Sequence, residues 1–244
     1  MHLIRMSSDD PLLDPAWNAL QTVHSHFAVR NGPAVRYPAD VVPYAALANA
    51  DHTNLSPLAE LLTPGELVYV IGAKPESPKP GSSKSIQIGP PLNCFQMIFP
   101  AQSQPNVASP DDASSETEII RMTPQDAPAM VALTDLAFPG FFRPRTNEMG
   151  VYYGIRANGE LVAMAGERLA VPGISEISAV CTHPAHTGKG HARLLMTRLL
   201  HDHADSGKRS FLHVNELNHH AFGIYQRMGF TVLRSVALWP ISIS

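Results

Sequence analysis

The loop Gly188-Lys189-Gly190 is the part of the chain whose residue types and position are best suited to bind an anion. Before the loop, a run of apolar residues that stops at Pro184 predicts a strand over residues 174–182. After the loop, apolar residues spaced at i, i+3, i+4 and i+7 from Ala192 predict a helix. A strand that leads through glycines into a helix leaves backbone N–H groups unpaired at the positive end of the helix dipole. The pattern therefore predicts a pyrophosphate site.

Two familiar phosphate loops do not fit this segment. The P-loop pattern G-x-x-x-x-G-K-(S/T), aligned on Gly188-Lys189, places its first glycine at His183 and its last Ser or Thr at Gly190. The dinucleotide pattern G-x-G-x-x-G, started at Gly188, requires a glycine at Arg193, where a side chain would prevent close packing of helix and strand. The sequence therefore excludes both patterns.

A second block lies after a predicted strand over residues 210–214 and before one over residues 231–238. It has the spacing N-x-x-A-x-x-x-Y-x-x-x-G-F, carried by Asn218, Ala221, Tyr225, Gly229 and Phe230. In this order and spacing, the glycine loop and the second block resemble the GNAT superfamily of N-acetyltransferases. The resemblance covers roughly residues 118–240, about half of the chain.

The glycine loop is similar to the coenzyme A loop of that superfamily, whose signature is (Q/R)-x-x-G-x-(G/A). Gly190 and Ala192 match it, and Thr187 stands where the family usually has Arg or Gln. The resemblance implies acetyl-CoA as co-substrate, with backbone amides holding the pyrophosphate and residues 179–181 pairing with the pantetheine arm. The cofactor-binding residues that it implies are Ala179, Val180, Cys181, Thr187, Gly188, Lys189, Gly190, His191, Ala192, Asn218, Ala221 and Tyr225.

The predicted elements after residue 118 follow the GNAT order, including a hairpin at Asn158-Gly159. We therefore expect an α/β fold (α+β in some schemes) with a GNAT-like mixed, mostly antiparallel central sheet flanked by helices. A stretch rich in Pro and Ser favours a linker at residues 101–117, with the acetyltransferase domain at 118–244 and an α+β region at 1–100. That first region, with a predicted helix from Asp14-Pro15 to about Val29, is either a degenerate GNAT-like half or an unrelated α+β cap.

Transfer of an acetyl group from a thioester to an amine requires a base for the amine, a donor that polarises the carbonyl and an acid for the thiolate. Glu176 lies on the predicted strand fourteen residues before Gly190, the offset of the catalytic glutamate in some histone-modifying GNAT proteins. It is a candidate base. The alternative is a cross-strand ion pair, for instance with Arg168, because a mid-strand glutamate is costly unless paired or solvated.

Tyr225 is the candidate acid, because the tyrosine at this position of the family's helix points at the sulfur of coenzyme A. Its alternative is an amphipathic core residue whose hydroxyl stays in water. Asn218 lies two helical turns earlier, and it either contacts the pantetheine arm or is a plain helix N-cap. His183 and His213 are further candidates, as proton relays.

The loop after the first GNAT helix, where the superfamily forms its acceptor site, carries Phe141, Phe142, Arg143 and Arg145. The arginines fit a carboxylate, and the rings fit an apolar body. These residues are expected to bind an acceptor that has both an amine and a carboxylate, such as an amino acid or a related metabolite. Alternatively, the two rings pack against the N-terminal half.

Composition limits the partners. The net charge of −3 and the isoelectric point near 6.4 give no electrostatic basis for binding nucleic acid or an anionic membrane, and no apolar run approaches a membrane span. The two cysteines form no disulfide framework, so we expect a cytoplasmic protein. The twelve histidines lack metal-ligand spacing, so no metal is expected. The family also allows a homodimer.

These observations predict an acetyl-CoA-dependent N-acetyltransferase that moves the acetyl group directly to the primary amine of a small molecule. Two alternatives stay open. One is an acyltransferase that uses a longer acyl-CoA or a hydroxyl acceptor. The other is a coenzyme A sensor that lacks catalysis and retains the GNAT frame.

Overall fold

The computed structural model describes residues 7, 10–48, 53–76, 85–100 and 117–244. In it, one continuous sheet contains strands from both the N-terminal and the C-terminal halves of the chain. The strand order is β1-β2-β3-β4-β12-β6-β11-β10-β9-β8-β7, and β5 pairs with β12. Most neighbours are antiparallel, and the parallel pairs are β10 with β11 and β3 with β4. Within the described ranges, no helix is long and apolar enough to cross a membrane. The expected mixed, mostly antiparallel GNAT-like sheet is confirmed.

The C-terminal part follows the predicted order of elements. Its strands are β7 (Ile120–Arg121), β8 (Tyr152–Ala157), β9 (Glu160–Val171), β10 (Ile174–Thr182), β11 (Arg209–Asn215) and β12 (Thr231–Ile243). Its α-helices are α3 (Ala127–Ala137), α4 (His191–Asp205) and α5 (His219–Arg227), and Thr146–Met149 forms the 3-10 helix η6. A capping box between Thr123 and Asp126 begins the segment that leads into α3, as the sequence predicts.

The N-terminal part contains short elements. They are the 3-10 helix η1 (Pro11–Leu13), α1 (Pro15–Gln21), the 3-10 helix η2 (Ser25–Phe27), β1 (Val29–Asn31), β2 (Ala34–Arg36), β3 (Tyr44–Leu47), α2 (Ser56–Ala59), β4 (Leu67–Ile71), β5 (Ile86–Ile88) and β6 (Leu92–Ile98). The helix predicted from Asp14 to about Val29 is wrong in its second half. The α-helix ends at Gln21, because Thr22 leaves helical geometry and the chain turns into η2 and β1.

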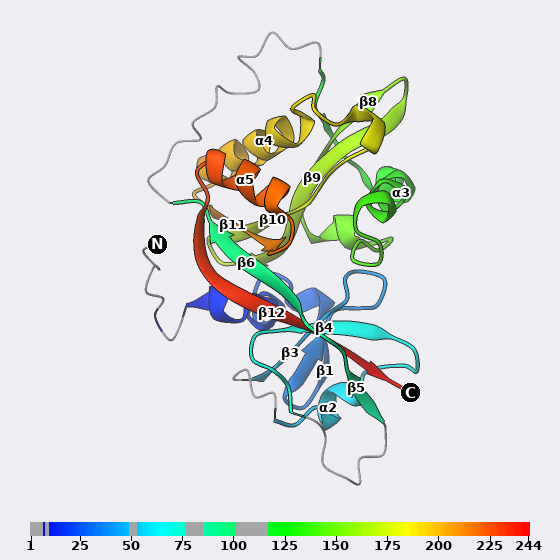
Figure 1. Ribbon diagram of the computed structural model, residues 1–244. Coiled ribbons are helices and arrows are strands. Elements are labelled where there is room, and N and C mark those ends of the chain that lie inside the picture. Colours follow the sequence, from blue (N-terminus) through cyan, green and yellow to red (C-terminus); the bar gives the residue numbers. More distant parts are fainter. Residues whose placement is uncertain (1–6, 8–9, 49–52, 77–84, 101–116) are drawn as a thin grey trace.

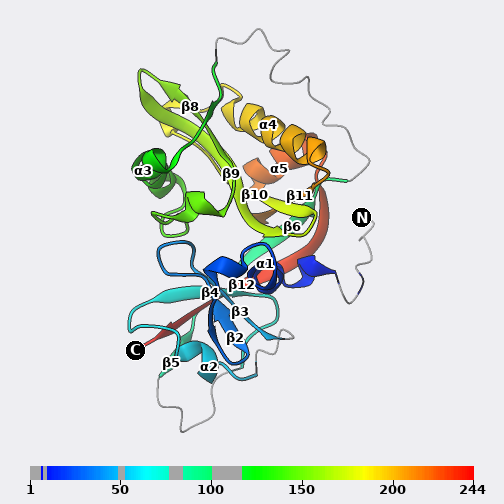
Figure 2. The same ribbon diagram turned by 180° about the vertical axis from the view of Figure 1, so that it is seen from behind.

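Strand β12 runs through both halves of the molecule, and β6 lies beside its first part and reaches the junction (Figure 1). β6 lies between β11 and β12, so residues from the first hundred complete the C-terminal sheet. β12 pairs with β6 over its first part and with β4 and β5 over its last part. Figure 2 shows α1 at the junction, where it contacts both β3 and β9. One hydrophobic cluster accordingly joins Leu20 and Tyr44 to Leu169 and Phe211.

The division into residues 1–100, a linker at 101–117 and a domain at 118–244 stays a prediction. Residues 101–116 of the linker lie outside the described part of the chain. Whether the first hundred residues are a degenerate GNAT-like half also stays a prediction. The shared sheet and the shared cluster show that the two regions pack as one body.

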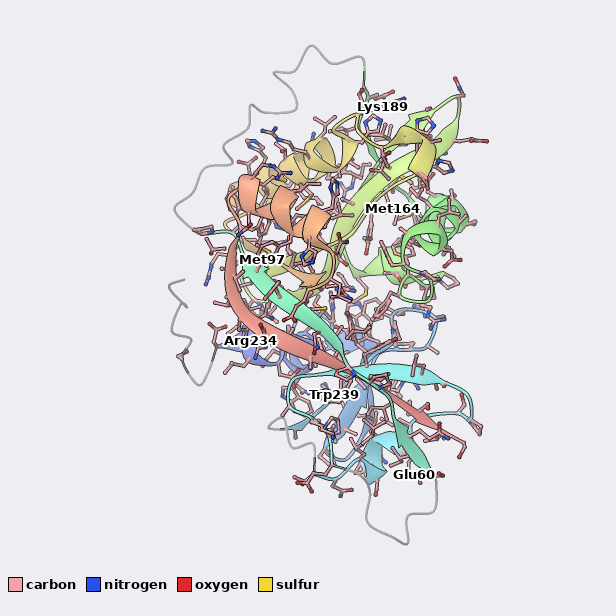
Figure 3. All side chains as sticks on the ribbon, viewed as in Figure 1. Glu60, Met97, Met164, Lys189, Arg234 and Trp239 are labelled. Carbon is pink, nitrogen blue, oxygen red and sulfur yellow. The ribbon has the colours of Figure 1, made fainter. Side chains whose placement is uncertain are left out.

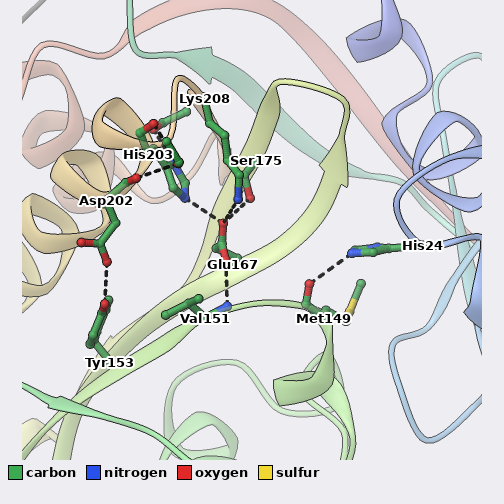
Figure 4. Close-up of polar contacts among 11 residues, drawn as sticks. His24, Met149, Val151, Tyr153, Glu167, Ser175, Asp202, His203 and Lys208 are labelled. Carbon is green, nitrogen blue, oxygen red and sulfur yellow. Dashed lines mark hydrogen bonds and ion pairs between the residues drawn. The ribbon is translucent and has the colours of Figure 1, made fainter.

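A buried polar cluster centred on Glu167 fixes β9, β10 and α4 relative to one another (Figure 4). One carboxylate oxygen accepts hydrogen bonds from Ser175 Oγ at 2.8 Å and from His203 Nε2 at 2.9 Å, and the other accepts the Val151 amide at 2.7 Å. His203 Nδ1 is 2.7 Å from Ser210 Oγ on β11. Burial would raise the pKa of Glu167, but these donors lower it to about 2. The carboxylate thus stays ionised and holds the elements that carry the site.

Candidate active site

Strands β10 and β11 separate from each other where the family resemblance places the cofactor. They pair only from Ile174–Arg209 to Glu176–Phe211, and β10 continues to Thr182 without that neighbour. A bulge follows, at which Ala179 has φ of +53° and the register with β9 skips from Ser178 to Cys181. The backbone near Ala179 therefore has an edge that another extended group can pair with.

The bulge also interrupts the alternation of side chains along β10. Strict alternation places Ile177, Ala179 and Cys181 on one face. In the structure, Ile177 packs with the α4 and α5 cluster, whereas Ala179 and Cys181 pack with the α3 cluster. Val180 packs on the Ile177 side, because the extra residue of the bulge reverses the alternation.

The glycine loop leads from β10 through the turn Pro184–His186 into α4. Gly188 and Gly190 both have a backbone φ of +78°, a conformation that residues other than glycine rarely adopt. Gly190 is also the N-cap of α4. The Leu194 amide makes the first bond back to Gly190, so the helical amides before it have no carbonyl within the helix. Lys189 lies beside this terminus, at the top of Figure 3. These features suit an anion.

Thr187, the residue that departs from the family signature, makes a hydrogen bond within the loop. Its hydroxyl donates to the Pro184 carbonyl at 3.1 Å. The side chain therefore closes the turn before the glycines, which is one of the functions expected of the usual Arg or Gln. His191 begins α4, and burial together with the charge of Lys189 lowers its pKa.

Tyr225 lies on α5 among the residues that pack against the bulged part of β10. Burial, with a smaller effect of the Cys181 thiol, raises the pKa of its phenol to about 12. Its hydroxyl has no hydrogen bond to any described residue. The phenol therefore keeps its proton at neutral pH and has it available for a ligand. Asn218 caps α5, because its Oδ1 accepts the Ala221 amide at 3.1 Å, and its role toward pantetheine stays a prediction.

Glu176 is fully buried, and it forms the ion pair with Arg168 that the sequence allowed. Arg168 donates from Nη2 at 2.6 Å and from Nε at 2.9 Å, and His213 Nδ1 lies 2.8 Å from the same carboxylate. Burial alone would raise the pKa of Glu176, but Arg168 and His213 hold it well below its usual range. Such a carboxylate is a weak proton acceptor, so the geometry favours the ion pair over the role of catalytic base.

Hydrogen bonds fix the tautomer of His213. Gln96 on β6 accepts from Arg234 Nε at 2.8 Å, so its NH₂ group faces the Leu12 carbonyl at 3.1 Å and His213 Nε2 at 3.2 Å. His213 Nε2 must then accept, and its proton is on Nδ1, directed at Glu176. Both ring nitrogens are engaged, which leaves neither for the proton relay considered from the sequence.

The four candidate acceptor residues of the loop after α3 have different surroundings: the two phenylalanines pack against other rings, and Arg145 lies at the surface. Phe142 is buried and meets the Tyr152 ring edge-on at 5.6 Å, and Phe141 stacks on Tyr69 of β4 at 4.8 Å. Arg145 is half exposed and pairs with Glu148 at 2.7 Å and with Asp40 at 3.3 Å. Of these four residues, Arg143 is the one that has a buried side-chain atom without a hydrogen-bond partner among the described residues, its Nε. Of the two arginines, Arg143 is therefore the one still able to bind a carboxylate.

Residues 152–239 match the family described as FR47-like protein. A protein from Novosphingobium aromaticivorans assigned to the GNAT family of acetyltransferases has 29% sequence identity and a TM-score of 0.82, with 97% of this chain and 100% of that chain covered. The C-terminal half of the chain is therefore similar to the GNAT acetyltransferases in both sequence and fold. No curated protein matches the chain in sequence.

Two further structures share the fold of the GNAT domain together with most of the N-terminal half. The GCN5-related N-acetyltransferase from Kribbella flavida is 17% identical, with 92% of this chain and 93% of that chain covered and a TM-score of 0.58. A GCN5-related N-acetyltransferase-like protein from Streptococcus suis is 10% identical, with 87% and 84% covered and a TM-score of 0.55. At these identities the likeness concerns the fold alone.

Sequence reasoning missed the contribution of the N-terminal half to the surroundings of the GNAT site. Tyr44 on β3 lies against the guanidinium of Arg168, whose central carbon is 5.0 Å from the ring centroid. Gln96 on β6 orients His213. Neither residue belongs to a GNAT motif, and the only signal was the apolar alternation around them. Among the described residues, no group of three or more His, Cys, Asp or Glu side chains could hold a metal ion.

Proposed function

We propose that this protein is an acetyl-CoA-dependent N-acetyltransferase that transfers the acetyl group directly to the primary amine of a small molecule. One observation carries the proposal: the bulged edge of β10 leads straight into the Gly188–Gly190 turn and the free amides of α4. An extended pantetheine can pair with the edge while the pyrophosphate binds the helix terminus. The similarity of the C-terminal half to GNAT acetyltransferases supports this proposal.

The proposed reaction follows from the residues at this edge. The amine nitrogen attacks the thioester carbonyl carbon, and a backbone N–H near Ala179 polarises the carbonyl oxygen. The C–S bond then breaks, and Tyr225 gives its phenolic proton to the departing thiolate. The amine proton passes to water, because the Arg168 and His213 contacts make Glu176 a poor base. The Tyr225 phenolate then takes a proton from water, which restores the phenol, and coenzyme A and the N-acetyl amine leave.

The first test uses the two glycines at opposite ends of α4. Gly190→Glu places a carboxylate where the pyrophosphate is expected, so it should abolish the rise in melting temperature that coenzyme A gives the wild type. Gly207→Glu is the matched control, since Gly207 also has a positive φ and open space around its Cα, at the other end of the helix. It should lose a similar amount of intrinsic stability and retain the coenzyme A shift.

Thermal shift assays measure the melting temperatures of wild type and both variants with coenzyme A, acetyl-CoA and longer acyl-CoA thioesters. Equal shifts in the two would contradict a pyrophosphate site at Gly190, and no shift with any thioester in the wild type would contradict the function. A screen of amines for thiol release then separates an enzyme from a sensor. It also separates an acetyl donor from a longer acyl donor and an amine acceptor from a hydroxyl acceptor.

A further inference from the structure

Three buried polar groups at the junction of the two halves have no hydrogen-bond partner within the described part of the chain. They are the hydroxyls of Tyr44 and Tyr152 and the Nε of Arg143. Tyr44 is 1% exposed on β3, and Tyr152 is 2% exposed at the start of β8. An unpaired buried polar group costs free energy, so it is rare unless water or a ligand completes it.

The loop at residues 141–143 packs between the surroundings of the two tyrosines. Tyr44 and Tyr69 are register partners on the parallel strands β3 and β4, so their side chains lie side by side. Phe141 stacks on Tyr69, and Phe142 meets the ring of Tyr152. Burial raises the pKa of Tyr69, and the charge of Arg143 lowers it, which places that guanidinium near Tyr69.

Arg168 connects the same groups to the separated strands. Its guanidinium lies over the Tyr44 ring, and its charge interacts with both Tyr44 and Tyr152. Its carboxylate partner, Glu176, is the last residue of β10 that pairs with β11. Tyr44 and Tyr152 therefore lie near the point where β10 and β11 separate, three residues before Ala179 of the bulge, and Arg143 lies beside Tyr69, the strand neighbour of Tyr44.

We propose that Tyr44, Tyr152 and Arg143 form the binding site for a carboxylate of the amine acceptor, and that the N-terminal half thereby completes the acceptor site. The proposal rests on the acetyltransferase function proposed above. It assigns the acceptor to amines that also carry a carboxylate, as in an amino acid. The carboxylate anchors the acceptor and leaves its amine free to reach the thioester at the bulge.

The chemistry of the three groups selects a carboxylate. Arginine Nε–H can only donate. Burial raises the pKa of both phenols well above the usual range, so Tyr44 and Tyr152 retain their protons and can donate as well. Arg143 forms no salt bridge with any described residue, whereas Glu176 is already neutralised by Arg168. The site thus offers donors and one uncompensated positive charge, which suits an anionic acceptor with two oxygens and disfavours a polyamine.

The experiment removes each hydroxyl and varies the acceptor. Wild type, Tyr44→Phe and Tyr152→Phe are assayed for thiol release from acetyl-CoA with amino acids, their carboxamides and the matching decarboxylated amines. We expect wild type to prefer the amino acids, and each variant to raise the acceptor KM about 10- to 100-fold with kcat nearly unchanged. The KM for acetyl-CoA should not change.

Tyr37→Phe is the matched control, because Tyr37 is equally buried nearby but its hydroxyl lies 2.9 Å from His24 Nδ1. It should lower the melting temperature and leave the acceptor KM unchanged at temperatures where it is folded. Tyr44→Phe and Tyr152→Phe remove unpaired hydroxyls, so their melting temperatures should stay constant or rise.

Two results would overturn the proposal while leaving the acetyltransferase function intact. One is turnover of carboxamides or decarboxylated amines as efficient as that of the amino acids. The other is an acceptor KM within twofold of wild type in both variants. Absence of thiol release with every amine, together with no stabilisation by coenzyme A, would instead overturn the proposed function, and this inference with it.

Discussion

Tyr225→Phe is expected to lower kcat by about 10²- to 10⁴-fold, the usual range for loss of a positioned proton donor. The phenol is the one titratable group on α5 that packs against the bulge of β10, and its raised pKa of about 12 keeps the proton available at neutral pH. Affinity for acetyl-CoA should change little, because the proton is needed only when the thiolate leaves. Steady-state kinetics and coenzyme A binding measured on the same preparation check both statements.

Tyr153→Phe provides the control for this variant. Tyr153 belongs to the same hydrophobic cluster, but its hydroxyl donates to Asp202 of α4 at 2.5 Å. Its loss should cost about 1–3 kcal/mol of stability with kcat within a few fold of wild type. A kcat for Tyr225→Phe as high as that of Tyr153→Phe would show that solvent water, and not this phenol, protonates the thiolate.

Local signals predicted the GNAT elements well. Pro184 ended the apolar run over residues 174–182, and β10 has those bounds. The Asn158-Gly159 pair predicted the hairpin between β8 and β9, and both residues have positive φ. These features depend on residues that are close in sequence, so the sequence alone sufficed.

Features that depend on distant residues were not predictable in the same way. Nothing in the segment Leu92–Ile98 indicates that it pairs with β11 and β12, more than a hundred residues away. The bulge at Ala179 has no glycine to mark it, so simple alternation would group Ile177 with Ala179 and Cys181, whereas Ile177 packs on the side of Val180. The sequence offered an ion pair with Arg168 as one reading of Glu176, but the addition of His213 and Gln96 required the fold.

The last prediction concerns Glu176→Gln, which should destabilise the protein by about 3–5 kcal/mol, because it leaves the buried guanidinium of Arg168 without its counter-charge. The folded-state pKa of Glu176 lies well below its unfolded value of 4.5. Its contribution to stability is therefore complete above about pH 5 and is lost as the pH falls through the folded-state value. Denaturant unfolding of wild type and variant from pH 7 to pH 3 measures this dependence.

Glu167→Gln is a matched control, since Glu167 is also buried and its pKa is lowered to about 2. Its shift from 4.5 corresponds to about 3 kcal/mol, present above about pH 5 and lost toward pH 2. Both variants should therefore lose stability at neutral pH and show a weaker acid dependence than wild type. Only Glu176→Gln should also raise the acceptor KM, because Arg168 lies against Tyr44.

The same pair of variants decides whether Glu176 is a base. The deep lowering of its pKa means that Glu176 stays ionised across the range in which enzymes of this kind are assayed, so it sets no acidic limb of the kcat profile above about pH 5. We expect Glu176→Gln to retain the shape of the wild-type pH profile. A profile whose acidic limb vanishes in Glu176→Gln but persists in Glu167→Gln would restore Glu176 as the catalytic base. In that case the ion pair with Arg168 would have to open during turnover.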